Sequence, residues 1–127
     1  MSLEKVFFGF FVLFAATLNF GFFVGDISDP RLHSSIELYA ALVVSVFATI
    51  LKLGDRTQIG AVHLATSLVA DIQLIASSIL YALNSSGGRL PDAHMTAMIV
   101  SLSGGALVAN VVSVVLLVIE TSTFRRR

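Results

Sequence analysis

The longest uncharged stretch of this sequence runs from Thr96 to Ile119 and reads TAMIVSLSGGALVANVVSVVLLVI. A helix needs about 20 predominantly apolar residues to cross the hydrocarbon core of a bilayer, and this stretch is long enough. Lipid restricts a spanning segment to a helix or a closed barrel, because the backbone must satisfy its own hydrogen bonds. A barrel strand would alternate in polarity over about 10 residues, and this continuous run does not. The stretch therefore predicts a transmembrane helix.

Three further apolar stretches precede it and predict three more helices. They run from about Val6 to Val24, from Ile36 to Leu53 and from Ile59 to Leu83, and polar connections separate them. The second is short for a membrane span and would thin the bilayer locally or sit beside longer neighbours. We expect an all-α integral membrane protein that is a single domain over residues 1–127, with four transmembrane helices at about residues 4–25, 35–53, 57–83 and 95–120.

The composition agrees with a membrane protein. Of the 127 residues, 56% are hydrophobic and only 13% are charged, with a mean hydropathy of +0.91. A soluble domain is typically about 25% charged, so the bilayer must cover the excess apolar surface. The chain has no cysteine, which excludes disulfides, thiolate zinc sites and a cysteine nucleophile. No basic patch suits a nucleic acid.

The distribution of Lys and Arg predicts the orientation. Cytoplasmic segments of membrane proteins carry an excess of these residues. With both termini inside (N-in/C-in), only Arg31 and Arg89 fall outside. We expect a multi-pass protein of a bacterial inner (plasma) membrane. Six basic residues then lie on the cytoplasmic side: Lys5, Lys52, Arg56, Arg125, Arg126 and Arg127.

Asp71 is the residue most indicative of function. It lies near the middle of the third stretch, where a carboxylate costs several kcal/mol and must face a bundle interior, a wet cavity or a subunit interface. It is either a site for a cation or proton or a hydrogen-bonded carboxyl that holds helices together. The spacing of four and three residues places it on one helix face with other polar side chains. This helix face comprises His63, Ser67, Asp71, Leu74 and Ser78.

The candidates for the ion pathway are the polar residues of this face together with Gln73. His63 and Asp71, with a further partner, would form a proton relay, although a single histidine near a helix end is more often structural. Gln73 lies on a different side of the helix from Asp71 and is predicted to make a second polar contact, with another subunit.

The second and fourth stretches each carry a stripe of small residues. In the second, Glu37 and Lys52 are expected to anchor the helix ends at the two membrane interfaces. In the fourth, small side chains let helix backbones approach closely, and Asn110 is placed to bridge helices. The stripe in the second stretch is Glu37, Ala41, Ser45, Ala48 and Lys52. The fourth stretch has two adjoining stripes. The first is Ser101, Gly105, Ala109 and Ser113, and the second is Ser103, Ala106, Asn110 and Ser113.

These patterns favour binding or transport over catalysis. No nucleophile has a plausible base beside it in the sequence, and no metal-ligand cluster or phosphate-binding glycine loop occurs, so no enzyme activity, cofactor or metal is expected. Polar faces on three helices exceed what one bundle is expected to bury, which predicts a homo-oligomer. The leading hypothesis is an oligomeric channel or transporter for a small cation or proton, with Asp71 on the pathway. The alternative is an accessory or assembly subunit of a larger membrane complex.

Overall fold

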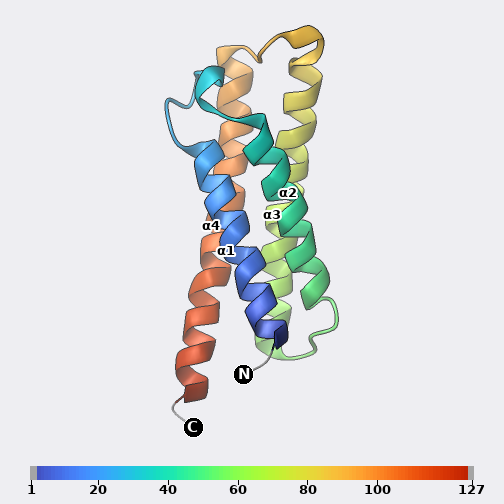
Figure 1. Ribbon diagram of the computed structural model, residues 1–127, viewed down its shortest axis with the longest axis vertical. Coiled ribbons are helices and arrows are strands. Elements are labelled where there is room, and N and C mark those ends of the chain that lie inside the picture. The colour runs from blue at the N-terminus through green and yellow to red at the C-terminus, as the bar shows by residue number, and fades with distance from the viewer. Residues whose placement is uncertain (1–2, 126–127) are drawn as a thin grey trace.

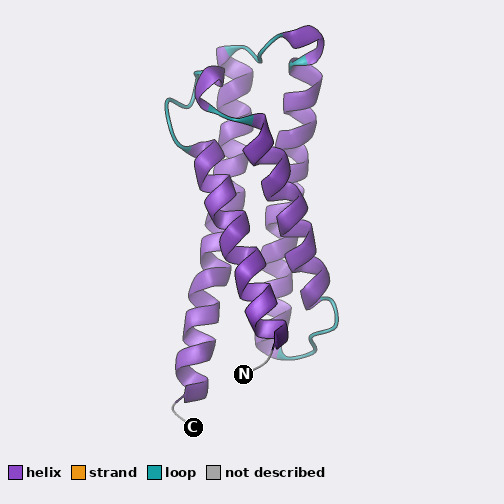
Figure 2. Cartoon of the chain, in the orientation of Figure 1, coloured by secondary structure: helices purple, strands orange, loops and turns teal. Residues whose placement is uncertain are grey.

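Four helices form an elongated antiparallel bundle in the computed structural model, which describes the backbone of residues 3–125 and the side chains of residues 3–122 (Figure 1). Figure 2 shows only helices, turns and loops, and no strand occurs between residues 3 and 125. All four helices are long and apolar enough to cross a membrane, which confirms the predicted all-helical architecture. The helices are α1 (Leu3–Phe23), α2 (Ser35–Lys52), α3 (Gln58–Asn84) and α4 (Ala93–Arg125), with short 3-10 turns at Pro30–Leu32 and Ser86–Gly88.

The two ends of the bundle differ in what they contain. The start of α1, the end of α4 and the tight α2–α3 turn lie together at one end, which we name the terminal end (Figure 1). The two longer connections lie at the other end, the loop end. Of the basic residues in the sequence, Lys5, Lys52 and Arg56 lie at the terminal end and Arg31 and Arg89 at the loop end. Arg125 ends α4, and Arg126 and Arg127 lie outside the described residues.

Local chemistry explains where the helices begin and end. The Thr57 hydroxyl accepts a hydrogen bond from the Gly60 N–H at 3.0 Å and caps α3. The Asp92 carboxylate accepts one from the Met95 N–H at 2.8 Å in the first turn of α4. Beyond α1, Gly25 adopts φ of 110°, a left-handed conformation that favours glycine and turns the chain toward the loop.

Each helix packs against two neighbours, in the order α1, α2, α3, α4 and back to α1. The main core cluster contains Phe22, Leu38 and Leu74. A smaller cluster with Phe8 and Val12 lies toward the terminal end. Large apolar side chains also cover the outside of the helices, as a lipid-facing surface requires.

The interior also contains many polar side chains, and this bears on two expectations. Polar residues of α2, α3 and α4 are buried within the single chain, so an excess of unburied polar faces is not a reason for oligomerisation. Ser101 is exposed, and Gly105 and Ala109 border an outward groove on the α3–α4 face, whereas Ser113 faces inward. The adjoining stripe is buried throughout and consists of Ser103, Ala106, Asn110 and Ser113, and Ala109 of the first stripe is buried as well.

Candidate functional site

Asp71 lies in the interior of the bundle, where two hydroxyl groups of α2 contact its carboxyl group. The Ser45 hydroxyl lies 2.6 Å from Oδ1 and the Thr49 hydroxyl lies 2.5 Å from Oδ2. Only 7% of Asp71 is exposed, and Ser45 and Thr49 are buried as well. The two hydroxyl residues are one helical turn apart on α2, so both reach the same carboxyl group across the α2–α3 contact. We name Asp71, Ser45 and Thr49 the Asp71 cluster.

A third hydrogen bond closes the Asp71 cluster. The Thr49 hydroxyl also lies 3.1 Å from the backbone carbonyl oxygen of Ser45, within α2. A hydroxyl group has one proton to donate. Thr49 therefore cannot donate to Asp71 and to the Ser45 carbonyl at the same time, and the direction of its bond depends on whether Asp71 carries a proton.

No cation neutralises Asp71 among residues 3–122. The ion pairs there join Lys5 to Glu120, Arg31 to Asp29 and Lys52 to Asp55, with His63 close to Glu120. Lys52, only 1% exposed, is the buried lysine at the end of α2, and its ammonium turns to the terminal end instead of to Asp71. Within the part of the chain whose side chains are described, the carboxyl group thus has hydroxyl partners but no counter-charge.

The other candidates on the α3 face are buried but lie away from the Asp71 carboxyl. Ser67 is buried one turn from Asp71 toward the terminal end. Ser78 is buried two turns away toward the loop end, and its hydroxyl has no hydrogen-bond partner among the described residues. Beside it, the Ser77 hydroxyl donates to the Ile99 carbonyl at 3.0 Å and ties α3 to α4.

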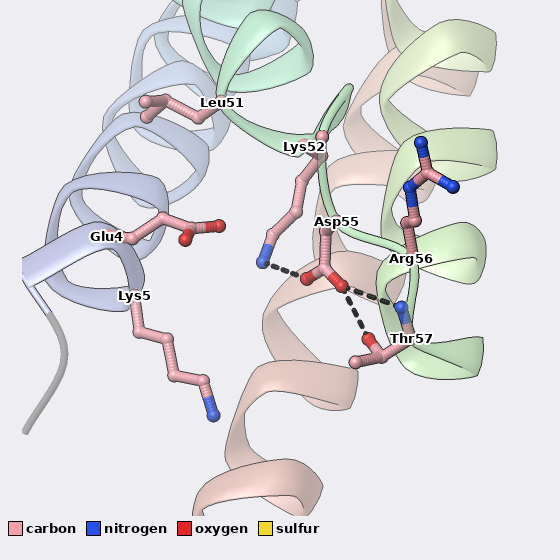
Figure 3. Close-up of a pocket in the computed structure, with 8 residues that line it drawn as sticks. Glu4, Lys5, Leu51, Lys52, Asp55, Arg56 and Thr57 are labelled. Carbon is pink, nitrogen blue, oxygen red and sulfur yellow. Dashed lines mark hydrogen bonds and ion pairs between the residues drawn. The ribbon is translucent and has the colours of Figure 1, made fainter.

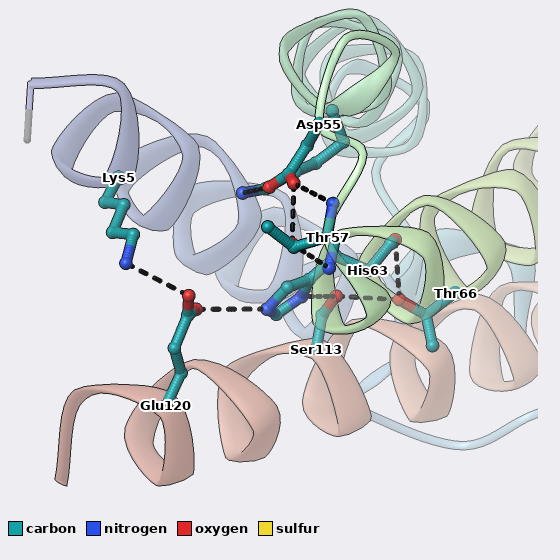
Figure 4. Close-up of polar contacts among 9 residues, drawn as sticks. Lys5, Asp55, Thr57, His63, Thr66, Ser113 and Glu120 are labelled. Atoms are coloured by element: carbon teal, nitrogen blue, oxygen red, sulfur yellow. Dashed lines mark hydrogen bonds and ion pairs between the residues drawn. The ribbon is translucent and has the colours of Figure 1, made fainter. Parts of the chain in front are cut away.

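His63 forms a second polar cluster, separate from Asp71. Its Nδ1 lies 3.2 Å from the Ser113 hydroxyl, and its Nε2 lies 3.8 Å from Glu120 Oε1 (Figure 4). Eight residues of α3 separate His63 from Asp71, which is about 12 Å along a helix. Direct proton transfer between them is therefore excluded in this conformation. The acid that faces His63 is Glu120 of α4. Sequence analysis did not single out Glu120.

Gln73 reaches across the α3–α4 contact of its own chain, and its expected contact with another subunit stays a prediction. A Cβ at position 105 would collide with the Gln73 side-chain oxygen, so the absence of a side chain at Gly105 gives Gln73 room across the α3–α4 contact. This oxygen is buried and has no hydrogen-bond partner among residues 3–122.

Two asparagines add polar groups to the interior. Asn19 of α1 accepts a 2.6 Å hydrogen bond from the Ser103 hydroxyl of α4, but its amide nitrogen has no partner within the described chain. The amide nitrogen of Asn110 is likewise unpaired and buried. A buried unpaired donor costs about 1–3 kcal/mol, so internal water is the expected partner for both.

Charged side chains surround a cavity of about 470 Å³ at the terminal end. Figure 3 shows the Lys52 ammonium facing the Asp55 carboxylate, 3.2 Å away, while Arg56 points away from them. The Lys52 ammonium also lies 4.4 Å from the centre of the buried Phe8 ring, which provides a cation–π contact. Lys52 thus turns into the chain at the end of α2, and its expected role as an interfacial anchor stays a prediction.

Asp55 organises the turn between α2 and α3. Hydrogen bonds from the Thr57 hydroxyl and N–H, and then the nearby Lys52, hold the pKa of Asp55 at about 2, below its ordinary value of 3.8. The carboxylate is therefore ionised at neutral pH and balances the charge of Lys52. No group of three or more His, Cys, Asp or Glu residues is placed to hold a metal ion within the part of the chain that the structure describes.

Comparison with known proteins places the chain in a family. No curated protein and no solved structure matches it. One family does match, over residues 32–121, which is more than half of the chain. The matched region contains α2, α3 and most of α4, and with them all of the Asp71 cluster as well as His63 and Glu120. The chain therefore belongs to DUF6394, a family of unknown function.

Proposed function

We propose that this chain is a multi-pass membrane protein that moves a small cation, in the first place a proton, and that Asp71 is the group that binds it. The observation that carries the proposal is a buried carboxyl group with both oxygens hydrogen-bonded to hydroxyls and with no counter-charge among residues 3–122. Hydroxyl and carboxyl oxygens also suit a small hard cation such as Na⁺.

Asp71 has no counter-charge among residues 3–122, which makes its ionised form costly. An ionised carboxylate near the middle of a membrane costs several kcal/mol unless it is paired. Two hydroxyl donors offset part of this cost, but a single positive ion removes most of it. The Asp71 cluster therefore favours a bound proton or metal cation over a bare carboxylate, and a group that holds an exchangeable cation within a membrane is suited to transport.

Counting protons favours a proton. If Asp71 is protonated, its Oδ2–H donates to Thr49, Thr49 donates to the Ser45 carbonyl, and Ser45 donates to Asp71 Oδ1. Each of the three contacts then holds one proton. If Asp71 is ionised, Thr49 donates to Asp71 and its contact with the Ser45 carbonyl has no proton. The protonated form is the only one that satisfies the whole ring.

The membrane orientation and the assembly are part of the proposal. Four helices of spanning length and the greater number of basic residues at the terminal end support an N-in/C-in topology in a bacterial inner membrane. A homo-oligomer is supported by an apolar outward groove of about 280 Å³ between α3 and α4, bordered by Gly105 and Ala109. Mass measurement in mild detergent tests the oligomer, and a single-chain mass would contradict it.

The alternative, an accessory subunit of a larger complex, has less support. Recognition of a partner through intramembrane polar groups needs those groups on the outside of the helices. Here the Asp71 cluster turns inward. The exposed Thr17 hydroxyl donates to the Phe14 carbonyl of its own helix, 2.8 Å away.

Ion flux through liposomes tests the proposal. The purified protein is reconstituted, a membrane potential is imposed, and the uptake of protons and of Na⁺ is recorded separately. We expect proton uptake well above that of protein-free vesicles, and Asp71→Asn should reduce it to that background. The matched control is Asp92→Asn, which removes a carboxylate at the loop end and retains a side-chain oxygen to cap α4.

The hydroxyl partners provide a second comparison. Ser45→Ala and Thr49→Val should reduce flux, whereas Ser77→Ala removes a buried hydroxyl that bonds only to the Ile99 carbonyl and should not. Uptake of Na⁺ without protons would identify the cation as Na⁺ and refute the proton count. The absence of any flux with the wild-type protein, or full flux with Asp71→Asn, would overturn the proposal.

A further inference from the structure

We infer that His63 and Glu120 form a second proton-binding site, at the terminal end of the bundle, in which His63 Nε2 accepts the proton. The two facing atoms, His63 Nε2 and Glu120 Oε1, lie 3.8 Å apart, and neither has a hydrogen-bond partner among the described residues. His63 is fully buried, whereas 16% of the Glu120 side chain is exposed. Glu120 is thus the member of the pair that solvent reaches.

The hydrogen bonds on the other side of the ring decide which nitrogen is free. Thr66 donates its hydroxyl proton to the His63 carbonyl at 2.9 Å (Figure 4). Ser113, whose hydroxyl lies 2.7 Å from that of Thr66, must then be the donor of that bond. Ser113 has no proton left for the ring, so the 3.2 Å contact with His63 needs a proton on Nδ1.

The tautomer follows from this count. A neutral imidazole carries one proton, and three linked hydrogen bonds place it on Nδ1. Nε2 then presents its lone pair to the Glu120 carboxyl group. Two acceptors that face each other without a proton repel, and one proton between them turns the contact into a charge-assisted hydrogen bond. Such a bond is about 2.7–2.9 Å long, which a small rotation of Glu120 achieves from the present separation.

Charges of every neighbouring helix act on this site. Lys52 of α2 and Asp55 of the turn are near His63, and Glu120 also pairs with Lys5 of α1 at 3.1 Å. The Phe8 ring lies edge-on to the imidazole, with ring centres 4.9 Å apart, and keeps water away. Lys52 is already balanced by Asp55, so Glu120 is the acid available to a charged His63. When His63 binds a proton, it forms an ion pair with Glu120 between α3 and α4. Glu120 is the same carboxylate that pairs with Lys5 of α1.

Nitrogen NMR of the ¹⁵N-histidine-labelled protein tests the site directly. The ring nitrogen shifts report which nitrogen is protonated, and the spectrum of His63→Gln identifies the His63 signals among those of His33 and His94. We expect wild-type His63 to carry its proton on Nδ1 when neutral and to gain the second on Nε2 as the pH falls. In Glu120→Gln the proton affinity of His63 should fall about tenfold, as removal of an opposite charge at this distance implies.

Two control variants separate this site from general effects. Glu4→Gln removes an equal charge at the terminal end from a residue with no contact to His63, and should change its proton affinity less than twofold. Ser113→Ala removes the acceptor of the Nδ1 proton, so the neutral His63 ring should no longer prefer its proton on Nδ1. A neutral wild-type ring protonated on Nε2 would overturn the inference without any variant, and so would equal titration in wild type and Glu120→Gln. The site does not depend on transport: Asp71→Asn should leave the His63 titration unchanged.

Discussion

Replacement of Asp71 by Asn and by Leu separates a protonated carboxyl group from an ionised one. Asn has the shape of a protonated Asp: its oxygen accepts from Ser45 and its amide donates to Thr49, whose hydroxyl remains free to donate to the Ser45 carbonyl. If the native carboxyl group holds a proton, the ring of hydrogen bonds survives in Asp71→Asn. The free energy of unfolding should then change by no more than about 0.5 kcal/mol.

Asp71→Leu removes both side-chain hydrogen bonds between α2 and α3. Measured intramembrane hydrogen bonds average about 0.6 kcal/mol and reach about 1.7 kcal/mol. Two such bonds give a destabilisation of about 1 kcal/mol at the average value and about 3 kcal/mol at the upper value. The Ser45 hydroxyl also loses its partner, while Thr49 retains the Ser45 carbonyl. Leu should therefore be clearly worse than Asn.

The assay is reversible unfolding in mixed micelles, in which denaturing detergent is titrated against the helical signal. The order expected is wild type equal to Asp71→Asn, followed by Asp71→Leu. If Asn destabilises the bundle as much as Leu does, the ring does not contain a protonated carboxyl group and the proton count is wrong. Equal stability of all three proteins would show that the Asp71 cluster contributes nothing to the α2–α3 contact.

Three further predictions concern the turn and the topology. The pKa of Asp55 is about 2 in the folded protein and 3.8 ordinarily, so its stabilising effect should be complete above about pH 4 and disappear as the pH falls through 2. Acid titration of the wild type and of Asp55→Asn should therefore show a difference in stability that shrinks in this window. A constant difference would contradict the prediction. Gly60→Ala should destabilise by about 1–3 kcal/mol, because the new Cβ would collide with the Asp55 carboxylate, whereas Gly54→Ala meets open space and should be nearly neutral in the same unfolding assay. Because the chain has no cysteine, Gly87→Cys and Gly54→Cys permit labelling with an impermeant thiol reagent in whole cells. Gly87→Cys should react from outside, and Gly54→Cys should not. The reverse result would refute the N-in/C-in topology.

The fold followed from sequence because its signal lies in single helices. Three of the four apolar stretches reach the length of about 20 residues that a membrane span needs, and each of the four could be predicted without the others. The end of α4 was less predictable: the helix continues past Ile119 to Arg125, because charged and polar residues outside the hydrocarbon core still sustain a helix. Apolarity marks the segment that lipid covers and not where the helix stops.

The candidate site was only half predictable, for a physical reason. Asp71 was evident because one acid in an apolar helix is costly wherever it lies. Its partners depend on the register between α2 and α3, which the tight turn at Asp55 and Thr57 sets and which no pattern within one helix contains. Ser45 appeared in a stripe without an assigned role, and Thr49 did not appear. Glu120 was missed because it lies beyond the apolar stretch, where acids are common.

The two proton-binding groups inferred here lie on one helix but need not work together. His63 and Asp71 are two turns apart on α3, and buried Ser67 lies one turn from each. A gap of about 12 Å is too long for direct proton transfer, and a single hydroxyl does not span it without water or a movement of the helices.

The Asp71 cluster is closed by hydroxyls of α2, whereas His63 is fixed by hydroxyls of α3 and α4. Each cluster is therefore complete without the other. Loss of transport in Asp71→Asn and the lower proton affinity of His63 in Glu120→Gln are independent outcomes. Only a variant that changes both would show that the protein couples them.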